Sequence, residues 1–309
     1  MSAVDLAQTS RETIRKGSKS FAAAAALFDA ETRADAEMLY AWCRHCDDVI
    51  DGQELGHGMA APADDTAHDR LTGLYAKTRA ALAGEPTNDP DFGAFQRVAL
   101  RRQIPERYAI ELIDGFAMDV CARRYETIED TLDYCWHVAG VVGVMMALVM
   151  GVRPDDLPTL RRAQDLGLAF QLTNISRDVI EDAQNGRIYL PAQWLAEAGV
   201  PEAQLTARQH RPALFAATRR LLAAAEPYYA SALAGLPELP FRSAWAIAAA
   251  RGVYRQIGVI VLQRGARAWD KRASASSPMK AWLALQGGFT ALASRGGKAG
   301  GRPGLWSKI

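Results

Sequence analysis

The chain has 309 residues, of which 49% are hydrophobic, enough apolar material for one large or two average-sized folding units. Its 36 basic and 35 acidic residues nearly cancel, so a nucleic-acid partner is not indicated. Four cysteines without a framework spacing, and the lack of an apolar amino-terminal run, predict a cytoplasmic protein without disulfides.

Helical periodicity prevails along the chain and strand alternation is nearly absent, which predicts an all-α fold. Neither a repeat nor a linker divides the sequence, so we expect one domain over residues 1–294, followed by a basic, glycine-rich and disordered tail over 295–309. The expected helices span about residues 4–27, 32–51, 69–83, 91–102, 106–122, 128–150, 158–184, 208–234, 241–268 and 278–293.

The second of these helices ends in an acidic stretch, Asp47-Asp48-Val49-Ile50-Asp51. Asp47 and Asp51 are about one helical turn apart, so their carboxylates project from the same face. The run that precedes them, from Met38 to Cys43, is too apolar for an exposed helix. We therefore expect this pair of carboxylates to lie beside the core.

The same helix carries Cys43-Arg44-His45-Cys46, which has the two-residue cysteine spacing of zinc and redox sites. A second ligand pair is missing, and no strand-helix context of the thioredoxin type precedes the motif. We expect His45 to be a packed residue or a partner of the acidic stretch instead.

A second acidic row, Asn174, Asp178 and Asp182, repeats the four-residue spacing after the apolar run Leu166 to Thr173. For either row alone, a solvated acidic face is an equally good interpretation. Opposed across a core, however, the two rows would repel each other unless cations neutralise them. Oxygen ligands without paired histidine or thiolate favour magnesium or manganese, and magnesium leaves part of its shell to substrate phosphates. A diphosphate is the expected substrate.

Several expected helices are apolar nearly all round, among them 138–150, 166–172 and 245–262. Central burial in a large bundle is one explanation. The second is an apolar cavity with the acidic rows at its mouth, the shape that an isoprenoid diphosphate requires. Gly140, Gly143 and Gly151 interrupt the longest run and Arg153 closes it, so we expect no membrane span there.

The chain carries only basic charges after Asp270. This asymmetry predicts a peripheral attraction of the tail to the anionic inner face of a membrane, as a secondary role. The basic residues are Lys271, Arg272, Lys280, Arg295, Lys298, Arg302 and Lys308.

Five motifs in sequence order carry a resemblance to a known family. They are Gly17-Ser18-Lys19-Ser20-Phe21, the segment 40–51, Tyr134-Cys135 with 138–143, the segment 171–182, and 186–191. From Ser10 to Lys271 the chain resembles the squalene and phytoene synthase family. The resemblance implies a single-domain class I isoprenoid synthase-like helical bundle around a central apolar cavity.

The resemblance also implies a reaction, the head-to-head condensation of two allylic diphosphates by a prenyltransferase. In the carotenoid branch, two geranylgeranyl diphosphates form phytoene through prephytoene diphosphate, and the product passes to the next enzyme of the pathway. Two to three Mg²⁺ or Mn²⁺ ions and no nicotinamide cofactor are implied. A squalene or dehydrosqualene synthase acting on farnesyl diphosphate, a chain-elongating prenyltransferase and a non-catalytic family member remain open alternatives.

Site roles follow from the resemblance position by position. The implied metal ligands are Asp47, Asp48, Asp51, Asn174, Asp178 and Asp182. The implied catalytic residues are Asp47, Asp51, Asp178 and Asp182 with Tyr134 and Tyr254. The implied diphosphate contacts are Ser18, Ser20, Arg44, Gln171 and Arg177. Phe21, Ala25, Asn174 and Arg187 are further expected substrate contacts. Glu181 is a helper in this scheme, and Arg272 departs from the usual family spacing.

Ala25 has a separate argument, because it lies about one turn past Phe21 in the run Ala22 to Ala26. If the neighbouring serines contact diphosphate, this small side chain leaves room for a long prenyl tail. An alanine run that simply packs tightly is an equally good interpretation.

Overall fold

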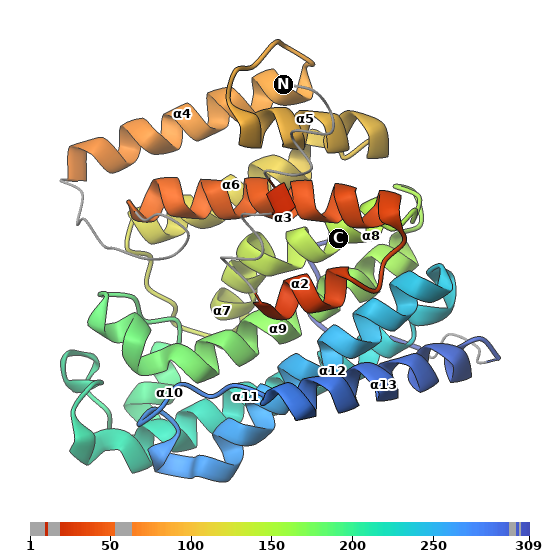
Figure 1. The fold of residues 1–309 in the computed structure, drawn as a ribbon. Coiled ribbons are helices and arrows are strands. Elements are labelled where there is room, and N and C mark those ends of the chain that lie inside the picture. Colours follow the sequence, from red (N-terminus) through yellow and green to blue (C-terminus); the bar gives the residue numbers. More distant parts are fainter. Residues whose placement is uncertain (1–9, 12–18, 53–63, 297–300, 303) are drawn as a thin grey trace.

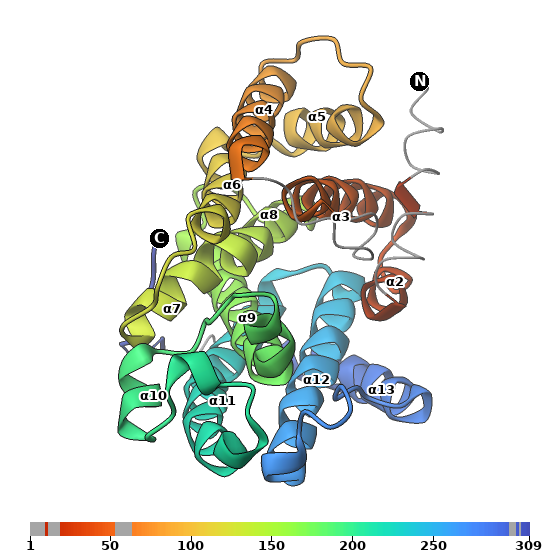
Figure 2. The same ribbon diagram turned by 90° about the vertical axis from the view of Figure 1, so that its left-hand side faces the viewer.

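The structure is a computed structural model of the chain and describes residues 10–11, 19–52, 64–296, 301–302 and 304–309. Every regular element within these residues is a helix, which confirms the all-α prediction. The long helix α9 crosses the middle of the bundle, with α3 on one side and α11 and α12 on the other (Figures 1 and 2).

The helices agree closely with the expected ones in most of the chain. They are α2 (Lys19–Ala25), α3 (Ala30–Asp51), α4 (Asp64–Leu82), α5 (Pro90–Arg102), α6 (Glu106–Val120), α7 (Ile128–Cys135), the π-helix η1 (Trp136–Gly140), α8 (Val141–Val149), α9 (Leu157–Gln184), α10 (Ala192–Glu197), α11 (Arg211–Leu233), α12 (Phe241–Arg264) and α13 (Ser277–Ser294). Single 3₁₀ turns lie at Glu202–Gln204, Arg208–His210, Leu236–Glu238 and Gly265–Arg267.

Three boundaries differ from the expectation. The first expected helix, 4–27, is described at residues 10–11 and from Lys19 onward, where α2 ends at Ala25 and residues 26–27 form a turn; residues 4–9 and 12–18 lie outside the described residues. The expected helix 128–150 is divided into α7, η1 and α8 by one π turn. The six-residue α10 was not expected, because it is too short to show a helical period.

The helix that carries the first acidic stretch is held by its apolar face. Trp42 is fully buried in α3 and stacks on Phe95 of α5, with ring centroids 3.8 Å apart. The side chain of Asp29 caps the start of α3, and Gly52 ends it in a left-handed conformation with φ 62°. Asp51 is therefore the last residue of a firmly anchored helix.

Glycines bring the η1 and α8 segment very close to α9. A Cβ atom at Gly143 would collide with the carbonyl oxygen of Ala163, and one at Gly167 would collide with that of Ala139. Only glycine permits this approach of two helix backbones. The close contact fixes the position of α9, the helix that carries the second acidic row.

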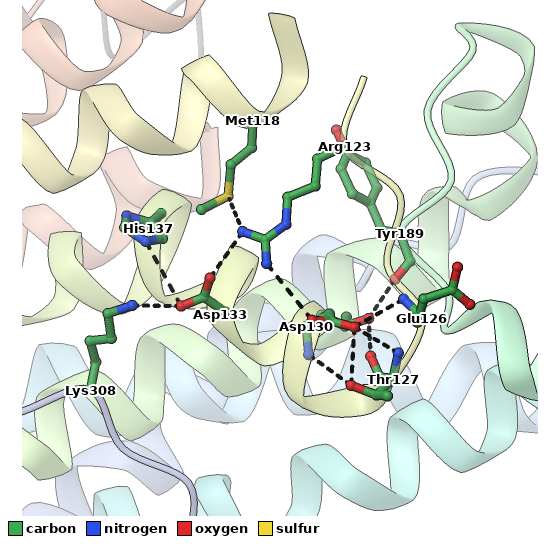
Figure 3. A network of polar contacts seen from close by, with 10 residues as sticks. Met118, Arg123, Glu126, Thr127, Asp130, Asp133, His137, Tyr189 and Lys308 are labelled. Atoms are coloured by element: carbon green, nitrogen blue, oxygen red, sulfur yellow. Dashed lines mark hydrogen bonds and ion pairs between the residues drawn. The ribbon is translucent and has the colours of Figure 1, made fainter. Parts of the chain in front are cut away.

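The carboxy-terminal residues are ordered against the bundle where the structure describes them. Arg302 makes a two-pronged ion pair with the fully buried Asp165 of α9, at 2.6 and 2.9 Å. Trp306 packs on the core, and Lys308 pairs with Asp133 of α7 at 2.7 Å (Figure 3). The prediction of a disordered tail over 295–309 is therefore wrong for residues 301–302 and 304–309. A buried carboxylate needs a counterion, and the tail supplies it.

Two helical segments, Ile128–Val149 and Phe241–Arg267, are long and apolar enough to cross a membrane by length and composition. The most apolar window of the first is 72% buried inside the fold, and that of the second is 39% buried. Core helices meet the same criteria.

Candidate active site

The two acidic rows lie on α3 and α9, and Arg187 connects them. The Arg187 side chain donates hydrogen bonds to both carboxylate oxygens of Asp51, one of them at 3.2 Å. Its backbone N–H donates to the carbonyl oxygen of Asp182 at 2.9 Å. The end of the first acidic helix is thus held beside the end of the second, which brings both predicted rows into one site.

Burial and mutual repulsion oppose ionisation of these carboxylates. Burial and then Asp51 raise the pKa of Asp47 to about 7, although 38% of the Asp47 side chain stays exposed and solvent weakens the effect. Burial, followed by Asp178 and Glu181, raises the pKa of Asp182 to about 8. Cations bound between the helices would favour the ionised form of both groups.

Arg44 lies one turn before the first acidic row and pairs with it. Its Nη1 is 3.0 Å from an oxygen of Asp47, and its Nε is 3.2 Å from an oxygen of Asp48. The guanidinium group therefore lies beside the carboxylates of the first acidic row, and a substrate diphosphate bound there could contact it.

Two further arginines surround the second row. Arg177 makes a two-pronged pair with Asp178, with Nε 2.8 Å from Oδ1. Arg272 lies between Asp178 and Glu181, at 2.8 and 3.0 Å. Its place beside this row supports a role for Arg272, which the departure from family spacing had put in doubt.

Asn174 presents an unsatisfied oxygen at the same site. Its amide nitrogen donates to the side-chain oxygen of Gln171 at 3.3 Å. Its Oδ1 is buried and has no hydrogen-bond partner among the described residues. Such an atom costs about 1–3 kcal/mol unless a ligand satisfies it. A buried amide oxygen beside clustered carboxylates fits a hard divalent cation.

An apolar cavity of about 330 Å³ adjoins the second acidic row, with Gln171 and Asn174 among its lining residues. Tyr254 of α12 and Phe170 of α9 also line it, and their rings stack with centroids 4.1 Å apart. This volume lies within the range of about 300–1,000 Å³ that is typical of small-molecule sites. The predicted apolar cavity is present, and it reaches the second acidic row at Asn174.

The cavity is elongated along α9. Its wall includes Thr159 and Asn174, whose separation of fifteen residues corresponds to about 22 Å of helix at about 1.5 Å per residue. Arg162 lies near the Thr159 end, where its Nη1 donates to the hydroxyl of Ser231 at 2.8 Å. A long apolar chain with a charged head matches this shape.

The amino-terminal predictions are only partly covered by the described residues. Ser18 lies outside them, and for Ser20 and Phe21 the structure describes the backbone alone, within α2. Ala25 is 1% exposed and lies in the cavity wall, where the spacing argument places it.

Tyr134 lies behind the carboxylates and is not among the residues that line the cavity. Its hydroxyl donates to one oxygen of Asp119 at 3.1 Å, and the hydroxyl of Tyr189 donates to the other at 2.9 Å. The two rings stack with centroids 4.5 Å apart. Burial raises the pKa of Asp119 to about 6, and Arg187 opposes the rise.

Nothing in the sequence pattern singles out Asp119, a lone carboxylate near the end of α6. Tyr189 belongs to the quoted segment 186–191, but the resemblance gave it no role. The backbone oxygen of Tyr189 accepts from the hydroxyl of Thr131 at 2.9 Å, close to the network of α7 (Figure 3). Asp119 and Tyr189 of this group interact electrostatically with Arg187.

Outside the acidic rows, His45, Asp89 and Asp91 place three ligand atoms within 4.8 Å of one another, the arrangement that a metal ion needs. The Nδ1 of His45 lies 3.2 Å from Asp91, and Lys77 pairs with Asp89 at 3.0 Å. Lys77 already neutralises Asp89, so an ion-pair network accounts for this group. His45 is a packed residue whose partners are on α5, not the first acidic row.

Cys43 and Cys46 lie in surroundings that do not suit a redox or zinc site. All four are free, including Cys43 and Cys46. Burial raises the pKa of both thiols well above the ordinary range, which opposes the thiolate that either chemistry needs.

Comparison with known proteins agrees with this geometry. A model of the squalene/phytoene synthase family matches residues 14–279. The chain belongs to this family. It is 56% identical over 284 residues to the 15-cis-phytoene synthase of Pantoea ananas, covering 92% of this chain and 91% of that protein. It is 52% identical over 305 residues to that of a Paracoccus species, covering 98% of each.

Solved structures of squalene/phytoene synthase relatives share the fold. A dehydrosqualene synthase bound to a ligand superposes with a TM-score of 0.83 at 27% identity, covering 94% of this chain and 98% of that one. A squalene synthase from Alicyclobacillus acidocaldarius has a TM-score of 0.71 at 24% identity, covering 85% and 96%. The predicted isoprenoid synthase fold is confirmed.

Proposed function

We propose that this protein is a phytoene synthase, a prenyltransferase that joins two molecules of geranylgeranyl diphosphate head to head and releases two diphosphates. Curated relatives that are 52–56% identical over most of the chain carry the name phytoene synthase. The observation that carries the proposal is the elongated apolar cavity that reaches the second acidic row at Asn174. An enzyme that ionises a lipid diphosphate needs both parts in one place.

The residues proposed to hold two to three Mg²⁺ or Mn²⁺ ions are Asp47, Asp48, Asp51, Asn174, Asp178 and Asp182. Bound there, the ions would supply positive charge that stabilises the departing diphosphate. The unsatisfied Oδ1 of Asn174 and the raised pKa of Asp182 support this assignment, since both disfavour the site without cations. Arg44, Arg177 and Arg187, together with Ser18, Ser20 and Gln171, are the proposed diphosphate contacts.

The proposed reaction begins when the allylic C–O bond breaks and diphosphate leaves with the electron pair. The double bond of the second substrate attacks the resulting cation, and proton loss closes the cyclopropane of prephytoene diphosphate. A second C–O cleavage, rearrangement and proton loss give phytoene. The stacked rings of Phe170 and Tyr254 present π-electrons to the cavity, which favours a cation there. The apolar wall excludes water, which would convert the cation to an alcohol.

A second candidate is a dehydrosqualene synthase that acts on farnesyl diphosphate, because the dehydrosqualene synthase structure superposes over 94% of this chain. The two candidates differ only in the length of the prenyl chain that the cavity accepts. We further propose that the protein is cytoplasmic, needs no nicotinamide, contacts an anionic membrane peripherally and passes its product to the next enzyme of the carotenoid pathway.

The test is product analysis with the purified protein and Mg²⁺, supplied with geranylgeranyl diphosphate or farnesyl diphosphate and no nicotinamide. The proposal expects a forty-carbon hydrocarbon of phytoene mass from the longer substrate, and much slower use of the shorter one. A thirty-carbon product alone would favour the second candidate. Hydrocarbon that forms only with reduced nicotinamide would overturn the proposed cofactor requirement.

A further inference from the structure

The outermost helix, α13, exposes a continuous apolar face, which we name the α13 stripe. It consists of Trp282, Leu285, Phe289 and Leu292, whose exposed fractions are 62%, 58%, 74% and 63%. Their spacing of three, four and three residues places all four on one side of the helix. Contiguous exposed apolar patches on soluble proteins usually mark an interaction site.

The opposite face of α13 is fixed to the fold. A Cβ atom at Gly287 would lie 2.7 Å from the backbone nitrogen of Ala249 in α12, so the two helices touch at their backbones. The indole of Trp245 donates to the carbonyl oxygen of Ala284 at 2.6 Å. Figures 1 and 2 show α13 at the edge of the molecule beside α12. The α13 stripe therefore points away from a helix that is already anchored.

The charges that α13 and the residues after it carry have one sign. Lys280 is the only charged residue between Ser277 and Ser294, and no acidic residue follows Asp270. Arg295 at the end of the helix is exposed and donates to the carbonyl oxygen of Pro237 at 3.0 Å, which holds it beside the α13 stripe. An apolar stripe with a basic residue at one end, and no acidic residue in its helix, complements an anionic lipid surface.

The same helix forms part of the cavity wall. Lys280 and Ala284 line the cavity from the inner side of α13, and the exposed Ala23 of α2 lines it as well. The cavity therefore reaches the protein surface near α2, and α13 separates it from the α13 stripe. An apolar substrate that enters the cavity from a bilayer has only a short path beside this helix.

We propose that the α13 stripe binds an anionic phospholipid bilayer, with α13 lying in the plane of the interface and the cavity next to the lipid. This goes beyond the proposed reaction and assigns the membrane contact to one helix. The basic tail is a poorer candidate, because Arg302 and Lys308 already pair with Asp165 and Asp133. A second copy of the chain is the other possible occupant, and the oligomeric state tests it below.

The test is sedimentation of the full chain with vesicles of phosphatidylcholine and phosphatidylglycerol, without substrate. The double variant Leu285→Glu/Phe289→Glu should bind at least tenfold more weakly than the unchanged protein. Leu100→Glu, at a position 53% exposed on α5, is the matched control and should bind normally. Quenching of tryptophan fluorescence by brominated lipid should decrease in Trp282→Phe. Turnover of detergent-dispersed substrate and helical content should stay unchanged in all variants.

Equal vesicle binding by the double variant and the unchanged protein would overturn the proposal, as would an unchanged protein that does not bind vesicles. If the unchanged protein is instead a dimer that the double variant dissociates, the α13 stripe joins two copies of the chain and the lipid assignment is wrong. Because no substrate is present, these outcomes are independent of whether the protein makes phytoene.

Discussion

At the scale of single residues, a substitution at Asp182 can distinguish a role in the reaction from a role in folding. Its raised pKa, about 8, shows that the ionised carboxylate is unfavourable in the protein without cations. Asp182→Asn should therefore lower kcat/KM about 1,000-fold, equivalent to about 4 kcal/mol of transition-state stabilisation. Thermal stability without metal should be unchanged or higher. Product formation and thermal unfolding measure the two effects.

Asp155→Ala is the matched control, because this carboxylate pairs with Arg153 on an exposed turn and its side chain is 67% exposed. The control should keep normal turnover and stability. If Asp182→Asn unfolded the protein, or kept normal turnover, the proposed metal role of this row would be wrong.

The same raised pKa values predict how metal and pH act together. The native state keeps protons on Asp47 and Asp182 that the unfolded chain loses near pH 4, so stability without metal should fall as pH rises toward about 8. Mg²⁺ displaces these protons. It should raise the unfolding temperature more at about pH 8.5 than at about pH 6, as calorimetry can measure. An equal or reversed effect would show that Mg²⁺ binds elsewhere.

The residues of the acidic rows could be predicted because their spacing is local. Asp47 and Asp51 lie one turn apart in α3, and Asn174 and Asp178 lie one turn apart in α9. The ion pair of Arg187 with Asp51 joins residues 136 positions apart, so no local period contains it. Asp119 has the same limitation, since its two tyrosine partners come from other parts of the chain.

At the scale of elements, α2 should control the length of substrate that the cavity accepts. Ala25 lies in the cavity wall and is 1% exposed, so the ring in Ala25→Phe would occupy space needed by the far end of a prenyl tail. We expect the preference for geranylgeranyl over farnesyl diphosphate to fall about 100-fold, or about 3 kcal/mol. Steady-state kinetics with each substrate measures this ratio.

Ala26→Phe is the control, because the neighbouring Ala26 is exposed and is not among the cavity-lining residues. It should leave the ratio unchanged. An equal loss with both substrates in Ala25→Phe would mean that the ring disturbs folding or the binding of the diphosphate group. In that case α2 does not determine which substrate length the cavity accepts.

The carboxy-terminal segment should contribute strongly to stability through one ion pair. Asp165 has a fully buried side chain, so Arg302→Ala would leave its charge without its principal counterion. The expected loss is about 3–5 kcal/mol of unfolding free energy in urea titration. Lys308→Ala removes a partly exposed pair with Asp133 and should cost under about 1 kcal/mol. Similar small losses in both variants would show that the tail is dispensable.

Long helices with a clear apolar period were predictable, and short or irregular ones were not. The π turn η1 packs closely against α9, where Gly167 meets Ala139, and helical periodicity does not reveal such packing. The order of residues 301–302 and 304–309 is hidden from the sequence for a similar reason. The glycines and basic residues of the tail suggest disorder, whereas its order comes from Asp165 far away in the sequence.

At the scale of the whole molecule, one arrangement explains the separate features. Arg187 joins the acidic end of α3 to that of α9, and the cavity extends along α9 from Asn174. The helix α13 contributes to the cavity wall and lies at the edge of the molecule (Figures 1 and 2). The all-α class followed from periodicity alone. The apolar cavity followed from the family resemblance together with the apolar helices, and its elongation along α9 required the structure.

The measurement that tests the central claim most directly is a crystal structure with Mn²⁺ and geranylgeranyl thiodiphosphate, an analogue whose C–S bond resists cleavage. Anomalous scattering locates the manganese, and the density locates the prenyl tail. The tail should run through the cavity from Asn174 toward Thr159, with manganese bound by Asp47, Asp51, Asn174, Asp178 and Asp182. Manganese bound instead by His45, Asp89 and Asp91, or a tail outside the cavity, would contradict the account.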